Sequence, residues 1–508
     1  MSANPVPRPE HPPRHSIADL VAVLGVQPDS ALGAGGGPIT GVSQDSAAVY
    51  RGDLYVALPG AKTHGARYVV DAIQRGAAVI LTDPAGAGSA REAAQPASVP
   101  LLVIDDPRAR LGEVAAWVYG DPSAGLTVLG VTGTNGKTTT VHLIEAGLRA
   151  AGHITGLIGT IETRVAGVAV PSVRTTPEAT DLQALYAVMR ERGVTAVAME
   201  VSSHALSLHR VDGTTFAAGL FTNLSQDHLD FHGDMESYFA AKAMLFDGRC
   251  GVDVVNVDDV YGRRLVRPST VTVSAAGRSD AHWRATDVHT AGTGSSTFTV
   301  RGPGQVTATA SVRAPGRFNQ ANALLAIAGL SAVEVPLADA LHGVATLDVP
   351  GRMEQVDRGQ SFLAVVDYAH TPEAVAAVLA ELRPRTAGRI IVVLGCGGDR
   401  DRDKRPLMGA AAAGGADLVV VTDDNPRSEE PARIRAAVVE GVRRAGQGRW
   451  LEIGDRRAAI EAAIAQAEPG DCVLVAGKGH EQGQEVAGNV HRFDDRQVLT
   501  ELLDAVAG

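Results

Sequence analysis

The stretch GVTGTNGKTTT, residues Gly130 to Thr140, decides the first expectation about this chain. It follows an apolar run over residues 126–131 and precedes a helical pattern over 141–151. A glycine-rich turn between a strand and a helix lets backbone N–H groups approach phosphate oxygens, while a lysine adds a charge and a threonine hydroxyl can bind Mg²⁺. The generic phosphate loop has a glycine where Val131 stands, so this loop is a variant. The sequence predicts a protein that handles ATP.

The composition excludes several classes of protein. The chain has 508 residues, 45% of them hydrophobic, which is enough for two to four domains. A formal net charge of −11 argues against a nucleic-acid partner, because phosphate backbones attract clustered Lys and Arg. The 3 cysteines are far apart, which favours a reducing cytoplasm over a disulfide framework or a zinc site. No apolar run is long enough to span a membrane, and the first residues lack a secretory core, so we expect a cytoplasmic protein.

Changes of pattern divide the chain into segments. The proline-rich residues 1–15 are predicted to be a disordered tail. Residues 16–124 read as a small α/β domain that ends in a turn-rich stretch at 120–125. Residues 125–349 form the predicted ATP-binding domain, with a strand over 195–199, a β-like excursion over 297–310 and a helix within GRFNQANALLAIAGL.

Residues 350–508 alternate between strands and helices, which predicts an α/β domain with a parallel sheet. In such sheets ligands bind beyond the carboxyl ends of the strands. Three loops are expected there: GCGGDRDRDK over 395–404, DDNPR over 423–427 and GKGHE over 477–481. The alternative is that their Gly, Asp, Asn and Pro residues only make turns.

Acidic and imidazole side chains supply candidate metal ligands. Glu200 ends a buried strand and would face the phosphate loop, although a glutamate in that place can also mark the start of a helix. The segment TNLSQDHLDFHGDMESYFAAKAMLF, residues 222–246, gathers two histidines and several aspartates. With no cysteine nearby, oxygen ligands and one imidazole around Mg²⁺ fit better than zinc. A solvated polar loop is the alternative.

Lys242 falls on the apolar stripe of a helix that Asp234 would cap. Its neighbours at helical spacing are Tyr238, Phe239 and Leu245, so its ammonium is expected to point inward. Buried lysines are rare unless they are paired or chemically used, and burial lowers the lysine pKa. The alternative is a side chain that extends out to water along its stem.

Several segments in this order resemble the Mur ligase family: GTNGKTTT, MEVSSHAL, TNLSQDHLDFHGDMESYFAAK, DYAHTP, GGDRD with KRPLM, DNPR and GKGHE. They lie within residues 43–481. The resemblance implies a three-domain α/β architecture, with a UDP-sugar domain, a central ATPase domain and a Rossmann-like parallel-sheet domain for an amino acid. It also implies cell-wall peptide synthesis, in which ATP converts a D-glutamyl carboxylate to an acyl phosphate that the amine of a diamino acid attacks.

The resemblance assigns roles to residues by their place in these motifs. It implies that Lys137, Glu200, His228 and Lys242 are catalytic, that Thr138 and Glu200 bind one Mg²⁺, that His228 and Lys242 serve a second, and that Lys242 is carbamylated. The implied ATP contacts are Gly133, Thr134, Asn135, Gly136, Lys137, Thr138, Thr139, Asn319, Asn322, Arg352 and Asp367. The implied contacts of the UDP-sugar-peptide are Gln44, Ser46, Ala61, Lys62, Thr63, Thr175, Thr176, Ser202 and Arg210.

For the amino acid, the resemblance implies Arg400, Asp424, Asn425, Pro426, Arg427, Gly477 and Glu481. The DNPR version is associated with meso-diaminopimelate, whose distal carboxylate Arg427 can grip with two hydrogen bonds. The expected substrates are therefore ATP, a UDP-N-acetylmuramoyl-dipeptide and meso-diaminopimelate. The protein is expected to be a monomer. Leu208 and Ala47 stand where many members of the family carry a glutamine and an arginine, which leaves details of substrate contact open.

Other readings remain at this point. The same ligase could use L-lysine or another diamino acid. A folylpolyglutamate synthetase shares the GTNGK loop, but the HLDFHGDM and DNPR segments fit it poorly. A GTPase would need an Asn-Lys-x-Asp motif, and no Asn-Lys pair occurs in the chain. The segment GCGGDRD has the wrong spacing for a dinucleotide-binding loop. A non-catalytic scaffold that binds ATP would form no amide.

Overall fold

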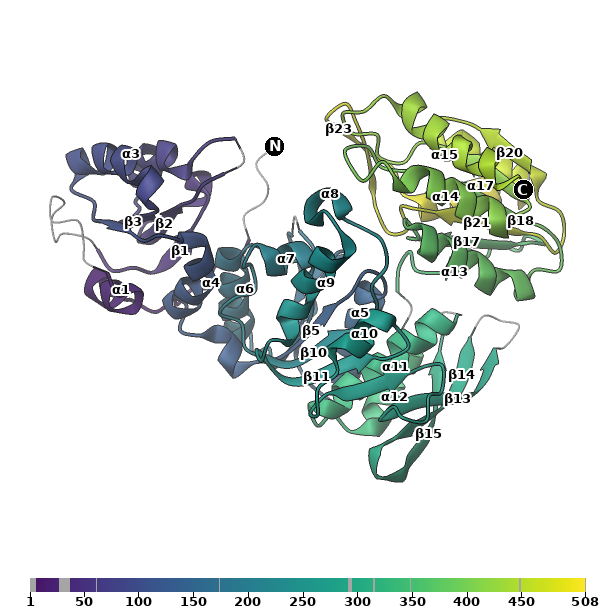
Figure 1. The fold of residues 1–508 in the computed structure, drawn as a ribbon, viewed down its shortest axis with the longest axis horizontal. Helices are drawn as coiled ribbons and strands as arrows, with labels where there is room; N and C mark the ends of the chain where they lie inside the picture. Colours follow the sequence, from purple (N-terminus) through teal and green to yellow (C-terminus); the bar gives the residue numbers. More distant parts are fainter. Residues whose placement is uncertain are drawn as a thin grey trace.

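The computed structural model describes residues 6–26, 37–60, 62–172, 174–290, 295–313, 316–347, 349–446 and 449–507. Three α/β units follow one another along the chain, each built on its own sheet (Figure 1). The strands of each sheet fall inside one of the three segments expected from the sequence. Within the described ranges no helix is long and apolar enough to cross a bilayer.

The first unit is a parallel 4-stranded sheet in the order β1-β2-β3-β4. Its residues alternate between the two faces, and helices bury apolar side chains against both. The strands are β1 (Gly41–Ser43), β2 (Asp53–Ala57), β3 (Val79–Thr82) and β4 (Leu101–Val103), and the helices are α1 (Ile17–Leu24), α2 (Val69–Gln74), α3 (Pro84–Ala94) and α4 (Pro107–Val118).

The described part of the leader differs from the disordered tail that its composition predicts. Arg8 donates from Nη1 to Asp53 Oδ1 at 3.0 Å and to the Tyr119 hydroxyl at 3.1 Å. The backbone N–H groups of Glu10 and His11 donate to the carboxylate of Glu191 at 2.9 and 2.8 Å. These specific polar contacts, which composition does not reveal, hold residues 6–15 against the first and second units.

The second unit has an 11-stranded sheet in the order β15-β14-β13-β12-β11-β10-β5-β9-β6-β7-β8. Its centre is parallel, and antiparallel strands extend it at both ends. The excursion expected over 297–310 is larger than predicted, because β13 joins β14 and β15 in a meander. The strands are β5 (Thr127–Thr132), β6 (Thr155–Ile158), β7 (Thr163–Val165), β8 (Val168–Val170), β9 (Ala196–Glu200), β10 (Phe216–Phe221), β11 (Cys250–Asn256), β12 (Val271–Ser274), β13 (Trp283–Thr290), β14 (Ser296–Gly302) and β15 (Val306–Val312).

Alternating side chains of β5 show how this sheet is covered. Leu129 and Val131 pack on one face with α5, α11 and α12, while Val128 packs on the other with α6, α7 and α9. The helices are α5 (Lys137–Ala150), α6 (Ala179–Glu191), α7 (Ser203–Ser207), α8 (Leu229–His232), α9 (Met235–Ala243), α10 (Val260–Leu265), α11 (Arg317–Ala332) and α12 (Leu337–Thr346).

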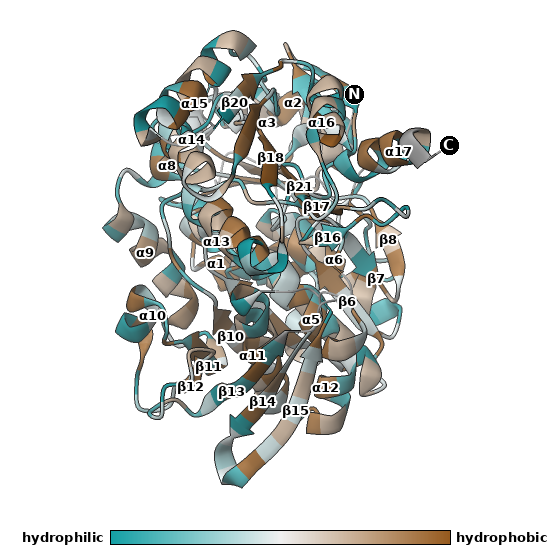
Figure 2. Cartoon of the chain, turned by 90° about the vertical axis from the view of Figure 1, so that its right-hand side faces the viewer, coloured by the Kyte–Doolittle hydropathy of each residue, from teal (hydrophilic) through white to brown (hydrophobic). Residues whose placement is uncertain are grey.

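The third unit confirms the predicted parallel sheet, with 6 strands in the order β16-β17-β21-β18-β19-β20 and an antiparallel edge at β16. Both faces are covered by helices, so the central strand β18 is apolar throughout and is brown in Figure 2. The strands are β16 (Glu354–Gln355), β17 (Leu363–Asp367), β18 (Ile390–Leu394), β19 (Leu418–Val421), β20 (Arg449–Glu452) and β21 (Cys472–Ala476). The helices are α13 (Pro372–Leu382), α14 (Lys404–Gly415), α15 (Pro431–Ala445), α16 (Arg456–Gln466) and α17 (Asp495–Ala507).

A separate hairpin follows the last strand of this sheet. It consists of β22 (Gly483–Val486) and β23 (Asn489–Arg492), which pair with each other as a 2-stranded sheet. An isolated hairpin is marginally stable in water, so contacts outside it must fix its position.

A buried ion pair in the third unit gives a test of its packing. Arg456 and Asp495 are both 0% exposed and join α16 to α17 through two hydrogen bonds of 2.8 and 2.7 Å. Asp495→Asn is expected to lower the free energy of opening at β21 by about 3 kcal/mol, because the guanidinium would stay buried without its counter-charge. Peptide-resolved hydrogen exchange measures this.

The matched control is Glu501→Gln, which removes the ion pair between Arg457 and Glu501 on the same two helices. The side chains of Arg457 and Glu501 are 48% and 44% exposed. Its cost is expected to stay below about 1 kcal/mol. Equal losses in the two variants would contradict the importance of burial.

Candidate active site

The phosphate loop lies where β5 ends and α5 begins. Gly136 precedes the helix with φ +86°, a left-handed conformation that favours glycine, and a Cβ there would lie 2.3 Å from Asn322 Oδ1. Lys137 donates from Nζ to the carbonyls of Gly133 and Thr134 at 2.9 and 2.8 Å. Burial lowers the pKa of Lys137, and the nearby acids Glu200 and Asp227 raise it in part. The loop, its lysine and the helix N-terminus together can hold phosphate groups.

A cavity of about 470 Å³ opens on one side of this loop. Residues of the central domain, from the phosphate loop and α11, meet residues that follow β17 of the third unit. Its lining includes the predicted ATP contacts Asn135, Gly136, Thr139, Asn319, Asn322, Arg352 and Asp367. The structure therefore brings together residues that lie more than two hundred positions apart in the sequence.

Arg352 and Asp367 connect the third unit to the phosphate loop. Arg352 donates from Nη2 to Thr138 Oγ1 at 3.0 Å, and its guanidinium lies 4.3 Å from the ring centre of Tyr368. Asp367 accepts hydrogen bonds from the backbone N–H groups of Met353 and Ala369, both at 2.7 Å. The Asp367 carboxylate thus fixes the turn that carries Arg352 toward the loop.

A second cavity of about 340 Å³ lies on the other side of the loop. It is polar, and its walls come from the carboxyl ends of strands in both the central and the C-terminal sheets. Among the predicted residues it includes Thr134, Lys137, Thr138, Thr175, Glu200, Ser202, His228, Arg400, Asp424, Asn425, Arg427, Gly477 and Glu481. Asn135, Gly136 and Arg352 line both cavities, so the two are neighbours across the phosphate loop.

Glu200 is fully buried at the end of β9. Its carboxylate accepts hydrogen bonds from the backbone N–H and the hydroxyl of Thr160, at 2.8 and 3.1 Å. The parallel pairing of β5 with β9 places it beside the start of the phosphate loop, as the sequence predicted. A buried carboxylate in that position can bind a divalent cation on the phosphates.

Lys242 is buried, which confirms the orientation predicted from the helical stripe. It is 1% exposed, Asp234 caps its helix α9, and its Nζ donates to the Gly133 carbonyl at 2.7 Å and lies 4.6 Å from the Tyr238 ring centre. Burial, and next the charge of Lys137, hold the pKa of Lys242 well below its usual value. Burial thus shifts the Lys242 amine toward its neutral, nucleophilic form.

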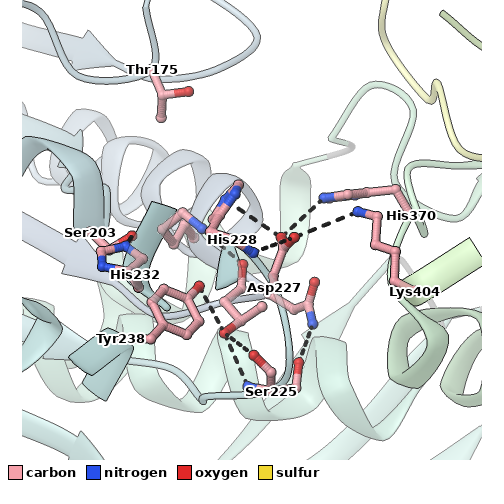
Figure 3. A network of polar contacts seen from close by, with 12 residues as sticks. Thr175, Ser203, Ser225, Asp227, His228, His232, Tyr238, His370 and Lys404 are labelled. Carbon is pink, nitrogen blue, oxygen red and sulfur yellow. Dashed lines mark hydrogen bonds and ion pairs between the residues drawn. The ribbon is translucent and has the colours of Figure 1, made fainter. Parts of the chain in front are cut away.

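Asp227 joins the central and C-terminal units (Figure 3). Its carboxylate faces His370 Nε2 at 3.6 Å, Lys404 Nζ at 3.5 Å and His228 Nε2 at 3.5 Å. Burial would raise the pKa of Asp227, but the contact with His370 and the positive charge of Lys404 outweigh it and hold the pKa well below its usual value. Asp227 belongs to the segment 222–246 that was expected to supply metal ligands, whereas no role was predicted for His370 or Lys404, although DYAHTP and KRPLM contain them.

His228 is a neutral imidazole in this setting, because burial lowers its pKa to about 3. No group of three or more His, Cys, Asp and Glu side chains that could hold a metal occurs in the ranges that the structure describes. Of the predicted metal ligands, the Thr138 hydroxyl, the buried Glu200 carboxylate and the His228 imidazole line the second cavity. This set suits Mg²⁺ that completes its coordination with phosphate oxygens and water.

The loops that follow β18, β19 and β21 converge on the second cavity, as their positions in a parallel sheet predicted. Arg427 donates from Nη1 to the Gly398 carbonyl at 2.7 Å, and its Nε lies 3.5 Å from Glu485 Oε2. Asn425 donates from Nδ2 to Glu481 Oε2 at 2.8 Å. Pro426 is not among the residues that line the cavity.

The residues expected to contact the UDP-sugar divide into two groups. Thr175 and Ser202 line the second cavity, and Thr176 bonds the Glu200 carbonyl at 2.8 Å, while Arg210 pairs with Glu178 at 2.8 Å. Gln44, Ser46, Lys62 and Thr63 belong to the first unit and line neither cavity. Ala61 lies outside the described residues. The Gln44 side-chain oxygen is buried without a hydrogen-bond partner, which is consistent with a place for a ligand.

The chain matches three family models in succession. These are the Mur ligase family catalytic domain over residues 38–119, the Mur ligase middle domain over 131–330 and the Mur ligase glutamate ligase domain over 351–479. It is 55% identical over 511 aligned residues to the UDP-N-acetylmuramoyl-L-alanyl-D-glutamate--2,6-diaminopimelate ligase of Streptomyces coelicolor, with 99% of each chain covered. The protein belongs to the Mur ligase family, whose members are ATP-dependent ligases.

Solved structures agree with this assignment. A structure of a UDP-N-acetylmuramoyl-L-alanyl-D-glutamate--2,6-diaminopimelate ligase matches at 33% identity with a TM-score of 0.64, covering 93% of this chain and 96% of that one. The Mycobacterium tuberculosis folylpolyglutamate synthase complexed with ADP matches at 19% identity with a TM-score of 0.62, covering 73% of this chain and 92% of that one. At this identity the second match shows a shared fold alone.

Two glycines allow a controlled test of the nucleotide cavity. Gly136→Ala adds a Cβ against Asn322, whereas Gly152→Ala at the end of α5 has a similar φ of +85° and nothing within 4 Å of the new Cβ. Both variants carry left-handed backbone strain, but only Gly136→Ala is expected to weaken ADP binding, by at least about tenfold. Isothermal titration calorimetry measures the two dissociation constants, and equal affinities would contradict the assigned cavity.

Proposed function

We propose that this protein is an ATP-dependent ligase that joins meso-diaminopimelate to UDP-N-acetylmuramoyl-L-alanyl-D-glutamate in peptidoglycan precursor synthesis. The observation that carries the proposal is the second cavity, where the phosphate loop and Glu200 face the loop that holds Arg427. A phosphorylated carboxylate and an incoming amine can therefore meet in one enclosed space. Identity of 55% over nearly the whole length to a ligase of that name supports the choice of substrates.

The reaction follows from this arrangement. A carboxylate oxygen of the D-glutamyl residue attacks the γ-phosphorus of ATP, and the bond to the β-phosphate oxygen breaks, which gives an acyl phosphate and ADP. Lys137, Arg352 and the backbone N–H groups at the start of α5 would offset the charge on the transferred group. The amine of the diamino acid then attacks the acyl carbon, loses a proton and expels phosphate, so that an amide forms.

We assign the metals to the donors on the loop side of the cavity. Thr138 and Glu200 would hold one Mg²⁺, and His228 with a carbamate on Lys242 would hold a second. Bound Mg²⁺ offsets the negative charge crowded between the triphosphate and the carboxylate. The carbamate forms when the neutral Lys242 amine attacks CO₂ and releases a proton. Lys137 lies close enough to lower the Lys242 pKa, so it would be a cationic neighbour for the resulting anion.

For the amino acid, Arg427 would take the distal carboxylate, and Arg400, Asp424, Asn425, Gly477 and Glu481 would complete the site. L-lysine lacks that carboxylate, so it would leave Arg427 without its partner. A folylpolyglutamate synthetase-like activity is not favoured, because the match to the solved enzyme of that kind is 19% identical. For the UDP-sugar, we propose that Gln44, Ser46 and residues 61–63 bind the nucleotide end, while Thr175, Thr176, Ser202 and Arg210 bind nearer the peptide.

We further propose that the protein acts as a monomer in the cytoplasm on small molecules, without a nucleic acid or a membrane. The three cysteines form no disulfide. Both cavities are lined by this chain, and its net charge of −11 disfavours nucleic acid.

The first test is ADP release with ATP, Mg²⁺ and UDP-N-acetylmuramoyl-L-alanyl-D-glutamate, with meso-diaminopimelate, L-lysine or no amine added. Turnover that depends on diaminopimelate is expected, with a tripeptide product by mass spectrometry. Arg427→Ala is expected to lower kcat/KM for diaminopimelate by at least about 100-fold, because a charged contact in an enclosed site is lost. The exposed Arg433→Ala serves as control. Turnover with lysine alone would contradict the assignment of the amine.

The carbamate on Lys242 has its own test. Lys242→Ala is expected to abolish turnover, and a short carboxylate such as formate, added at high concentration, should restore part of it by replacing the missing anion. Native mass spectrometry of the unmodified enzyme should show an added mass of one CO₂ that acid treatment removes. Full activity after thorough removal of CO₂ and bicarbonate would contradict the modification.

A further inference from the structure

A buried lysine with no predicted role, Lys478, lies behind the wall of the second cavity. Lys478 follows β21 by two residues and is 0% exposed. Gly477, between them, has φ +112°, and a Cβ there would lie 2.8 Å from Asp424 Oδ2. Only glycine readily adopts this conformation so close to the carboxylate, and the resulting turn sends the Lys478 side chain into the interior.

The buried ammonium contacts three residues of the amino-acid loops. Lys478 Nζ donates to Asn425 Oδ1 at 3.0 Å and to Glu481 Oε2 at 3.1 Å, and it lies 3.9 Å from Asp424 Oδ1. All three partners line the second cavity, whereas Lys478 is not among its lining residues. Its influence on a ligand must therefore pass through these partners.

These contacts fix the orientation of Asn425 and Glu481. Asn425 Oδ1 also accepts a hydrogen bond from the Glu485 backbone N–H at 3.0 Å, and Asn425 Nδ2 donates to Glu481 Oε2 at 2.8 Å. With its oxygen facing Lys478, Asn425 keeps one N–H for a ligand. Glu481 keeps its second oxygen, Oε1, as an acceptor for an ammonium group.

The charges in this wall also bear on the choice of ligand. Asp424 and Glu481 would attract any ammonium and repel a carboxylate, and the charge of Lys478 offsets part of their field. Two other charged groups of this region have acidic partners: Arg456 pairs with Asp495, and the Arg427 Nε faces Glu485. Without Lys478 this part of the cavity would be more acidic. It would then favour L-lysine, whose distal end carries only an ammonium group, over diaminopimelate, whose distal end carries an ammonium and a carboxylate group.

We propose that Lys478 is a specificity-determining positioning residue, which orients Asn425 and Glu481 and balances their acidic wall so that the cavity prefers an amino acid with a distal carboxylate. The proposal rests on the proposed function and adds a residue to it. Lys478 touches no reacting atom in this account.

The test compares Lys478→Met with the unmodified enzyme and with Arg457→Met, which removes a cation from an exposed ion pair of the same unit. For Lys478→Met, KM for meso-diaminopimelate is expected to rise at least about tenfold, because a hydrogen-bonded charge is lost, while KM for ATP changes less than about twofold. The ratio of kcat/KM for diaminopimelate to that for L-lysine should fall by at least about tenfold. Arg457→Met should leave the ratio unchanged.

A second variant separates charge from folding. Lys478→Gln keeps a side-chain donor without the charge. It should also lower the ratio of kcat/KM for diaminopimelate to that for L-lysine, even if KM for diaminopimelate rises less than in Lys478→Met. An unchanged ratio in these variants, with only reduced stability or with all KM values raised equally, would overturn the proposal. Absence of diaminopimelate turnover in the unmodified enzyme would instead contradict the proposed function, so the two failures are distinguishable.

Discussion

The arrangement of the site depends on the buried carboxylate of Asp227. It belongs to the central unit, yet two of its three partners, His370 and Lys404, come from the C-terminal unit. A buried charge without a partner is costly, so these contacts favour the position in which the two units meet. Both cavities lie along this junction, and Arg352 crosses it to reach Thr138. The enclosed space for chemistry exists because residues from two sheets share it.

Around that junction the protein concentrates buried charge. Lys242 and Glu200 are buried and Lys137 is half-buried within one polar region. For Lys242, burial and then the charge of Lys137 lower the pKa of the amine and so favour its nucleophilic form. Lys478 represents the opposite case, where an ammonium is surrounded by carboxylates and an amide oxygen. We thus propose that one lysine, Lys242, takes part in metal binding on one side of the cavity, and that another, Lys478, sets the choice of amino acid on the other side.

Much of this could be predicted from the sequence where a local pattern has a physical meaning. The spacing of apolar residues around Lys242 correctly predicted its burial, and strand-helix alternation correctly predicted the parallel C-terminal sheet. The pairing of Asp227 with Lys404 and the role of Lys478 were not predicted, because they arise from contacts between distant segments. The hairpin of β22 and β23 was missed as well. It is polar and short, and its position depends on bonds such as that between the Arg427 N–H and the Glu485 carbonyl at 3.0 Å. The composition of residues 6–15 also gave no indication that Arg8 pairs with the buried carboxylate of Asp53.

The central claim is that one cavity first activates a carboxylate and then joins it to an amine. The most direct measurement uses UDP-N-acetylmuramoyl-L-alanyl-D-glutamate labelled with ¹⁸O in the reacting carboxylate, followed by mass analysis of the phosphate released. Because the acyl phosphate keeps one carboxylate oxygen in the leaving phosphate, the account predicts one labelled oxygen in each phosphate molecule. Product formation with unlabelled phosphate would contradict it.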